Sequence, residues 1–299
     1  MLNSFFPMFF RKIKGIFALD IDGTVTAETE SIPSEVVQFF EDLYQTGWQF
    51  VFITGRPFQW GVRSLNVLSF PYALAVQNGA LIVDMPSKKI LARKYLSQNL
   101  LHEMEAICTK HHTDFIIYTG LENKDLCYYR SDKFAPSVLN YLWERKEHLK
   151  ENWSIIKNFN DLPVKVFASL KFFAKEKEAI LISQDIEKKL GLHAPNIRDP
   201  FNEEYFVVQV THPEANKGCA LKTYSQLSHS LYSSIAAGND FNDLSLLQEA
   251  TVKVAMSDAP GALLAIAHVI APPAHQQGII EGLTKAIDYL AKIGKMNNG

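Results

Sequence analysis

Cysteine is scarce in this sequence. Among its 299 residues only three are cysteines, Cys108, Cys127 and Cys219, and they lie far apart. An odd number at wide spacing argues against a disulfide framework. Reduced thiols are typical of proteins that stay in the cytoplasm, where disulfides are rarely stable. We therefore expect a cytoplasmic protein.

Long apolar runs are also missing. No window approaches the roughly 20 apolar residues that a helix needs to cross a bilayer. The first residues include Phe5, Phe6, Phe9 and Phe10, but Pro7 interrupts them and the basic residues follow rather than precede them, unlike in a signal peptide. We expect this segment to pack on the body of the protein. A weak membrane contact is the alternative.

Neither sign of charge is in large excess. The 30 Lys and Arg residues nearly balance 32 Asp and Glu residues, which gives a formal net charge of -2. A broad basic surface for nucleic acid is therefore not expected. A pocket for one phosphate group needs only one or two cations, so a small phosphorylated ligand stays compatible with this balance.

What the sequence does have is the pattern of an α/β protein. An apolar run at 16–19, an amphipathic stretch at 34–46 and a second apolar run at 50–53 predict a strand, a helix and a parallel strand. The same alternation returns late in the chain, with strands at 234–237, 252–255 and 269–270 and a helix at 282–293. We predict a Rossmann-like parallel sheet flanked by helices.

Between about residues 85 and 210 the pattern changes to an α+β order. The predicted elements there are helices at 98–111, 134–149 and 178–190 and strands at 115–118, 126–129, 164–173 and 205–210. A chain of this length readily forms two compact units. We predict a discontinuous core, residues 1–84 and 211–299, interrupted by an inserted α+β cap at 85–210.

Three predicted core strands end in polar residues. Asp20 and Asp22 follow the first strand, Thr54 follows the second, and Asn239 and Asp243 follow a later one. Ligands of open α/β sheets bind at the carboxyl ends of the strands, so we expect these side chains to lie together. Crowded carboxylates repel one another without a cation, and oxygen ligands favour a hard ion such as Mg²⁺.

These residue types suit phosphoryl transfer. A carboxylate nucleophile and a phosphate repel one another, and a divalent ion with a lysine cancels that repulsion. Asp20 offers the nucleophile, Asp22 a second carboxylate, Thr54 a hydroxyl, and Lys217 a cation near a predicted helix start. The sequence therefore predicts a phosphate-ester site at this edge of the sheet.

Four motifs resemble those of the haloacid dehalogenase superfamily, in the same order. They are DIDGT at 20–24, ITGR at 53–56, NKG at 216–218 and GNDFND at 238–243. The large insertion between the second and third motifs, and the segments at 78–80, 254–256 and 278–280, are similar to the Cof-type sugar-phosphatase branch. The resemblance covers nearly all of the two core segments, whereas the cap matches only in length and element order.

The resemblance implies roles for the matched residues. Asp20 would attack phosphorus, and Asp22 would act as general acid and then as general base. Thr54 and Lys217 would bind the phosphoryl group and steady its charge. Contacts to the substrate are also expected from Gly55, Arg56 and Asn78, although a surface ion pair is an equal alternative for Arg56. The expected ligands of Mg²⁺ are Asp20, Asp22, Asn239 and Asp243.

One position departs from the pattern of the branch. Its members usually have Asp where this chain has Asn239. An amide oxygen can bind Mg²⁺, but it carries no charge. We favour Asn239 with Asp243 as ligands. The alternative is that Asp240 turns inward and takes this place.

The predicted function is Mg²⁺-dependent hydrolysis of a small phosphorylated metabolite, such as a sugar phosphate, through an aspartyl-phosphate intermediate. A phosphomutase or phosphotransferase would use the same intermediate. A catalytically silent binding protein with this fold is the other alternative. The expected partner is a small phosphate ester, with neither nucleic acid nor membrane, and no pattern indicates an oligomeric state.

Two further clusters have plainer explanations. Cys108, His111 and His112 share helical spacing, but a zinc site needs a fourth ligand, so we favour a half-exposed helix. Cys219 is expected to be a small packing residue. Several aromatic residues of the cap offer a stacking surface for a sugar or, as we favour, the core of the cap itself. They are Tyr118, Tyr128, Tyr129, Trp143 and Trp153.

Overall fold

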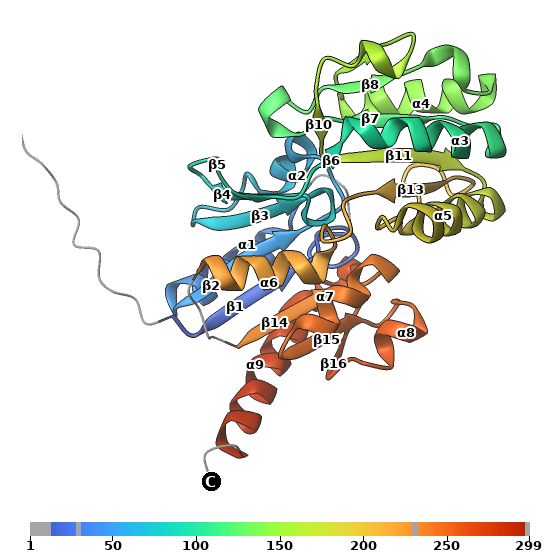
Figure 1. Ribbon diagram of the computed structural model, residues 1–299. Coiled ribbons are helices and arrows are strands. Elements are labelled where there is room, and N and C mark those ends of the chain that lie inside the picture. Colours follow the sequence, from blue (N-terminus) through green and yellow to red (C-terminus); the bar gives the residue numbers. More distant parts are fainter. Residues whose placement is uncertain (1–12, 28–30, 229–232, 297–299) are drawn as a thin grey trace, which may run out of the picture.

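The computed structural model describes residues 13–27, 31–228 and 233–296. The phenylalanine-rich first segment, which we expected to pack on the body, lies outside the described residues. The described residues form two main sheets with helices on their faces (Figure 1). None of their helices is both long and apolar enough to span a membrane.

The larger sheet has eight strands in the order β16-β15-β14-β1-β2-β3-β4-β5. Neighbours from β16 to β3 are parallel, and β4 and β5 continue the sheet antiparallel. This order puts β1 between β14 and β2 and confirms the predicted parallel α/β core. The strands are β1 (Gly15–Leu19), β2 (Trp48–Ile53), β3 (Tyr72–Val76), β4 (Leu81–Met85), β5 (Lys89–Arg93), β14 (Ser234–Gly238), β15 (Val252–Met256) and β16 (Val269–Ala271).

Helices cover both faces of this sheet. Successive side chains of a strand point to opposite faces, so Phe17 and Leu19 of β1 join one hydrophobic cluster and Ile16 and Ala18 join another. The first cluster includes residues of α1 (Ser34–Gln45), α2 (Phe58–Leu65) and α9 (Gly278–Met296). The second includes residues of α6 (Lys217–Leu227), α7 (Leu244–Glu249) and α8 (Gly261–Leu264).

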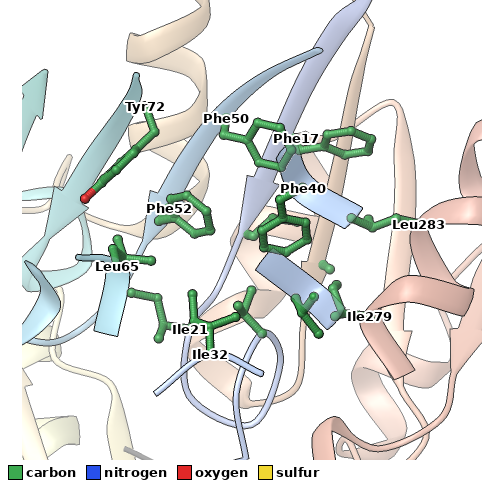
Figure 2. Close-up of a cluster of buried hydrophobic side chains, with 14 of the residues drawn as sticks. Phe17, Ile21, Ile32, Phe40, Phe50, Phe52, Leu65, Tyr72, Ile279 and Leu283 are labelled. Carbon is green, nitrogen blue, oxygen red and sulfur yellow. The ribbon is translucent and has the colours of Figure 1, made fainter. Parts of the chain in front are cut away.

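Phenylalanine rings fill the core beneath α1 (Figure 2). The ring of Phe40 lies 5.2 Å from that of Phe50 and 6.1 Å from that of Phe52, and Phe17 lies 5.2 Å from Phe50. Tilted aromatic pairs at such distances are favourable. This packing fixes β1 and β2, the two strands whose ends carry the first two motifs.

The second sheet has six strands in the order β12-β13-β11-β7-β8-β9, antiparallel except between β8 and β9. Figure 1 shows it above the larger sheet. Residues of α3 (Leu101–His111) and α5 (Glu176–Leu190) pack on one face and residues of α4 (Pro136–Leu149) on the other, as an α+β unit requires. The strands are β7 (Phe115–Tyr118), β8 (Cys127–Tyr129), β9 (Trp153–Ile155), β11 (Ser169–Ala174), β12 (Asn196–Arg198) and β13 (Phe206–Val210).

The predicted strand at 164–173 is wrong as a single strand. Its first part, β10 (Val166–Phe167), pairs with β6 (Leu96–Ser97) in a separate small sheet, whereas β11 belongs to the six-stranded sheet. Between them Ala168 donates its N–H to the Tyr118 carbonyl. The apolar run continues through this change of partner without a Gly or Pro, so the sequence carries no sign of the break.

The larger sheet continues past residue 84. Strand β5 pairs with β4 and forms the edge of the sheet, so the predicted core segment 1–84 ends within this antiparallel pair. The division into core and cap stays a prediction. We propose to place its first boundary after Arg93.

Candidate active site

The carboxyl ends of β2, β1 and β14 meet at one edge of the larger sheet, because these strands are parallel neighbours. A cavity of about 280 Å³ opens there, and residues of both sheets line it. Among the described residues, the predicted site residues that line this cavity are Asp20, Asp22, Thr54, Gly55, Arg56, Lys217 and Asn239, while Asn78 and Asp243 lie behind them.

Lys217 joins two carboxylates. Its Nζ donates to Asp20 Oδ1 and to Asp243 Oδ1, each at 2.6 Å, and all three side chains are buried. Burial lowers the pKa of Lys217, but the two ion pairs outweigh burial and raise the pKa above its ordinary value. Lys217 is therefore a permanent cation beside Asp20.

Burial and two charged neighbours determine the pKa of Asp20. Burial raises the pKa of Asp20 to about 8, the negative charge of Asp243 acts in the same direction, and the positive charge of Lys217 opposes both. A nucleophilic carboxyl group must be ionised. A cation near Asp20 would act together with Lys217 to keep it so.

Asn239 brings an oxygen atom to the other side of Asp20. Its side-chain oxygen accepts a hydrogen bond from Thr24 Oγ1 at 3.1 Å, and it lies 2.8 Å from the Asp22 main-chain oxygen and 3.2 Å from Asp20 Oδ2. Two ligand oxygens of an octahedral Mg²⁺ site are separated by about 3.0 Å, since each bond is about 2.1 Å long. With the amide turned over, its nitrogen would instead donate to both oxygens.

Asp243 is fully occupied by protein donors. Its Oδ1 accepts from Lys217, and its Oδ2 accepts from the main-chain N–H groups of Asn239 at 2.9 Å and Asp240 at 3.0 Å. The close approach requires Gly238, because a Cβ atom there would lie 2.5 Å from Asp243 Cβ. This arrangement orients Lys217 and the loop. The predicted role of Asp243 as a metal ligand stays a prediction.

Asp240 was the alternative ligand. It lines the cavity, but its Oδ1 accepts from the N–H of Phe241 at 2.6 Å at the start of a single 3₁₀ turn, Phe241–Asp243. Burial raises the pKa of Asp240. The loop structure thus accounts for Asp240, and Asn239 remains the better candidate ligand.

Arg56 binds the second carboxylate of the first motif. Its Nε donates to Asp22 Oδ2 at 2.7 Å and its Nη2 donates to Asp22 Oδ1, while Nη1 donates to Ser64 Oγ at 2.7 Å. The guanidinium lies 4.3 Å from the ring of Trp60 and is 2% exposed. Arg56 is therefore a buried partner of Asp22 that also lines the cavity, and its contact with the substrate stays a prediction.

Asn78 supports the second motif from behind. The hydroxyl of Thr54 accepts the N–H of Arg56 at 3.1 Å, and the carbonyl of Thr54 accepts the N–H of Asn78 at 2.9 Å. Asn78 is fully buried and adopts the left-handed conformation with φ of 56°. Through these contacts Asn78 supports Thr54 from behind the cavity wall.

The second sheet and its helix α4 contribute polar groups that were not predicted from the sequence: Arg145 from α4, and Lys171, Arg198 and Gln209 from the strands. For Lys171, the alternation of side chains along β11 could have predicted its direction. Leu170 and Phe172 face the hydrophobic cluster with α3 and α5, so Ser169 and Lys171 point to the opposite face. Lys171 Nζ and Gln209 Nε2 both donate to the Gly55 carbonyl, at 3.3 and 3.0 Å, and so connect the second sheet to the second motif.

Comparison with known families agrees with this geometry. A family model described as haloacid dehalogenase-like hydrolase matches residues 17–283. The chain belongs to this hydrolase family. The prediction from the four motifs is thus confirmed, as is the prediction that the chain is an enzyme of hydrolase type.

Distant relatives match most of the length of the hydrolase. Pyridoxal phosphate phosphatase YbhA of Escherichia coli (strain K12) is 22% identical over 278 residues, 85% of this chain and 92% of the relative. A phosphoglycolate phosphatase of Methanothermobacter thermautotrophicus is 23% identical over 277 residues, 91% of this chain and 98% of the relative.

Solved structures share the fold of the hydrolase. A haloacid dehalogenase-like hydrolase from Bacteroides thetaiotaomicron superposes with a TM-score of 0.71 at 19% identity and covers 91% of this chain and 99% of its own. The subclass IIB sugar phosphatase BT4131 gives a TM-score of 0.70 at 20% identity, with 91% and 98% covered. The Cof-type resemblance of the sequence agrees with this shared fold.

The zinc alternative is not supported in the hydrolase. Cys108 contacts Asp114 at 3.5 Å and His111 contacts Asp185 at 2.8 Å, so the two side chains have separate partners. Among the described residues no group of three or more His, Cys, Asp and Glu side chains is arranged to hold a metal.

The aromatic residues of the second sheet mostly belong to its own core, as we favoured. Tyr118, Tyr128 and Tyr129 are buried, and Trp143 is 46% exposed. None of them lines the cavity among the described residues, whereas Trp60 of α2 does. The aromatic residue in the cavity wall thus belongs to a helix of the larger sheet.

Proposed function

We propose that the chain is a phosphatase that hydrolyses a small phosphate monoester in the presence of Mg²⁺, with Asp20 as the nucleophile. The observation that carries this proposal is the buried Asp20 carboxylate, held 2.6 Å from Lys217 Nζ in the cavity wall. Lys217 offsets the charge of an approaching phosphate. The names of the relatives support a small phosphorylated metabolite, with a sugar phosphate as one candidate.

The reaction proceeds in two displacements. The Asp20 carboxylate attacks phosphorus, the bond from phosphorus to the leaving oxygen breaks, and Asp22 donates a proton to that oxygen. Asp22 then takes a proton from a water molecule, which attacks phosphorus and releases inorganic phosphate with free Asp20. Both oxygens of Asp22 contact Arg56. For each proton transfer, one of these oxygens gives up its contact with Arg56.

The oxygen atoms at the cavity edge fit a magnesium ion. Asp20 Oδ2, the main-chain oxygen of Asp22 and the Asn239 amide, with its oxygen turned toward them, would hold it, because the Asn239 amide lies 2.8 and 3.2 Å from the other two oxygens. When bound, Mg²⁺ would supply positive charge to the phosphoryl oxygens. Asp243 would act through Lys217 instead of as a ligand.

The proposal is tested with p-nitrophenyl phosphate and added Mg²⁺. We expect turnover that chelation by EDTA removes and Mg²⁺ restores. The substitution Asp20→Asn should lower kcat by at least about a thousandfold. Asp42→Asn, which changes an exposed carboxylate of α1, is the matched control and should leave kcat unchanged.

Other outcomes distinguish the alternatives. Free phosphate release without isomer formation supports a phosphatase over a phosphomutase or phosphotransferase. An Asp20→Asn enzyme as active as the unmodified one would contradict the proposed nucleophile. A lack of turnover with aryl phosphate and a broad panel of phosphate esters would favour the silent binding protein.

A further inference from the structure

The cavity contains more positive charge than the phosphoryl site uses. Among the described residues, five basic and three acidic side chains line it. Lys217 and Arg56 are paired with Asp20 and Asp22. Arg145, Lys171 and Arg198 remain. Arg198 is exposed, whereas Arg145 and Lys171 are buried and reach the cavity from α4 and β11, on the side of the second sheet.

Arg145 is buried with incomplete hydrogen bonding. It is 4% exposed, and its Nε and Nη1 atoms have no hydrogen-bond partner among the described residues. Its nearest carboxylate oxygen, Asp199 Oδ1, lies 3.8 Å from Nη1, and its other neighbours include the ring of Phe201 at 4.8 Å. Buried N–H groups without hydrogen bonds cost free energy, so Nε and Nη1 are poised to bind an acceptor.

Lys171 is also a buried cation with hydrogen-bond donors to spare. It is 3% exposed, its Nζ donates to the Gly55 carbonyl at 3.3 Å, and it lies 4.6 Å from the ring of Tyr118. An ammonium group has three donors, so this contact leaves capacity for an anion. Burial lowers the pKa of Lys171 to about 8, and the positive charge of Arg145 acts in the same direction.

We propose that the substrate carries a second anionic group on its leaving part, a carboxylate or a phosphate, which Arg145 and Lys171 bind. The inference rests on the proposed phosphatase function, since it assigns the phosphoryl end to Asp20 and Lys217. An anion between the two cap cations satisfies their free donors and cancels the repulsion between them. Arg145 and Lys171 are specificity-determining residues, because they bind the leaving part and not the phosphoryl group.

The size of the cavity limits the leaving part. Its volume of about 280 Å³ lies just below the usual range of about 300–1,000 Å³ for ligand sites. Apolar side chains, Trp60 and Val207 among them, line part of its wall. A short leaving part with one anionic end therefore fits better than a long or branched one.

The experiment uses matched pairs of esters with the unmodified enzyme. Glycerate 3-phosphate and glycerol 3-phosphate differ only in a carboxylate, and fructose 1,6-bisphosphate and fructose 6-phosphate differ only in a second phosphate. We expect kcat/KM to be at least about tenfold higher for the doubly anionic member of one pair. The pair that shows this preference identifies the anion as carboxylate or phosphate. Equal kcat/KM within both pairs would overturn the inference.

Variants then assign the preference to the two residues. Lys171→Met should remove most of the preference, because kcat/KM for the doubly anionic ester should fall at least about tenfold more than kcat/KM for the singly anionic ester. Loss of the contact to Gly55 affects both esters and cancels in this comparison. Arg145→Lys, which keeps the charge beside Asp199, should reduce the preference with the fold retained, as checked by circular dichroism. Lys175→Met is the matched control, because Lys175 is an exposed cap lysine paired with Glu204. Equal losses for both esters of a pair would contradict the assignment.

The two proposals fail differently. Turnover of p-nitrophenyl phosphate without any preference for a second anion would support the phosphatase function and exclude anion binding by Arg145 and Lys171. Absence of turnover with every ester would reject the proposed function, and the inference would fall with it.

Discussion

At the scale of single residues, the chemistry depends on which cation each carboxylate contacts. Asp20 contacts Lys217, and Asp22 is held at both oxygens by Arg56. The two acids are only two positions apart, yet they have different partners and so can take different roles. Under the proposed function, Asn239 adds an uncharged amide to this part of the site, so the affinity for the cation would depend on that amide.

Replacing Asn239 by Asp should strengthen Mg²⁺ binding. The added negative charge lies 3.2 Å from Asp20 Oδ2, so it repels Asp20 until the cation is present. We expect the Mg²⁺ concentration for half-maximal activity to fall by about tenfold, because ligand charge tunes cation affinity. Asn239→Ala should raise it, whereas Asp240→Ala should change it by less than about threefold. The reverse order for the two alanine variants would assign the ligand to Asp240.

The charge of Lys171 should make the preference for a second anionic group depend on pH. Its pKa of about 8 lies below the ordinary 10.5, so the cation is present below about pH 8 and lost above it. Burial is the main cause, Arg145 adds to it, and Glu151 opposes it. The ratio of kcat/KM for the doubly and singly anionic esters should therefore fall as pH rises through 8. Titration of Asp20 affects both esters and cancels in this ratio.

Lys171→Arg provides the control for this profile. Arginine stays charged throughout the range, so the ratio should become independent of pH. A ratio that falls equally in the unmodified enzyme and in the Lys171→Arg variant would show that another group titrates.

At the scale of helices and strands, the site depends on how β1, β2 and β14 end. All three were predicted from the sequence, because buried parallel strands appear as continuous apolar runs followed by polar residues. Helix α2 was not predicted. It contains Gly61 and is only eight residues long, Phe58–Leu65, too short to be recognised as a helix, yet it supplies Trp60 and Ser64 to Arg56. The short strands β9 and β12 were missed because they are partly exposed.

Gly238→Ala should damage the site through the end of β14. A Cβ atom would lie 2.5 Å from Asp243 Cβ and 2.8 Å from its Oδ2, so Asp243 must move away from Lys217. We expect kcat to fall by at least about tenfold and the free energy of unfolding by about 1–3 kcal/mol. Gly261→Ala is the control, because nothing lies within 4 Å of its Cβ position. Equal effects of the two substitutions would show that crowding at Asp243 is not the cause.

At the scale of the whole molecule, the cavity exists because the second sheet contacts the end of the first. Gln209 Nε2 donates to the Gly55 carbonyl and, at 2.6 Å, to Gln77 Oε1, while Ser169 Oγ donates to Gln77 Oε1 at 2.8 Å. The parallel order of the core and its polar strand ends follow from local pattern. The face that the second sheet turns toward the core does not, because it depends on how two distant segments pack. Arg145 and Gln209 were missed for this reason.

Gln209→Met should weaken the contact between the two sheets. The buried acceptors of Gly55 and Gln77 each lose one of two donors, since Lys171 and Ser169 still donate to them. The loss is therefore that of two hydrogen bonds, at about 0.5–1.5 kcal/mol each. We expect a lower melting temperature and a higher KM, measured by thermal unfolding and steady-state kinetics. Gln38→Met, on the exposed face of α1, is the control. A Gln209→Met protein with unchanged stability and KM would show that these hydrogen bonds do not position the second sheet.

The most direct test of the account is to isolate the phosphorylated enzyme. The Asp22→Asn variant lacks the base for the second displacement, so a good leaving group such as p-nitrophenolate should allow the phosphoryl enzyme to accumulate. We predict that acid-quenched protein carries one phosphoryl group, and that mass spectrometry of its peptides places this group on Asp20. A phosphoryl group on another residue, or steady turnover by an Asp20→Asn protein, would contradict the account.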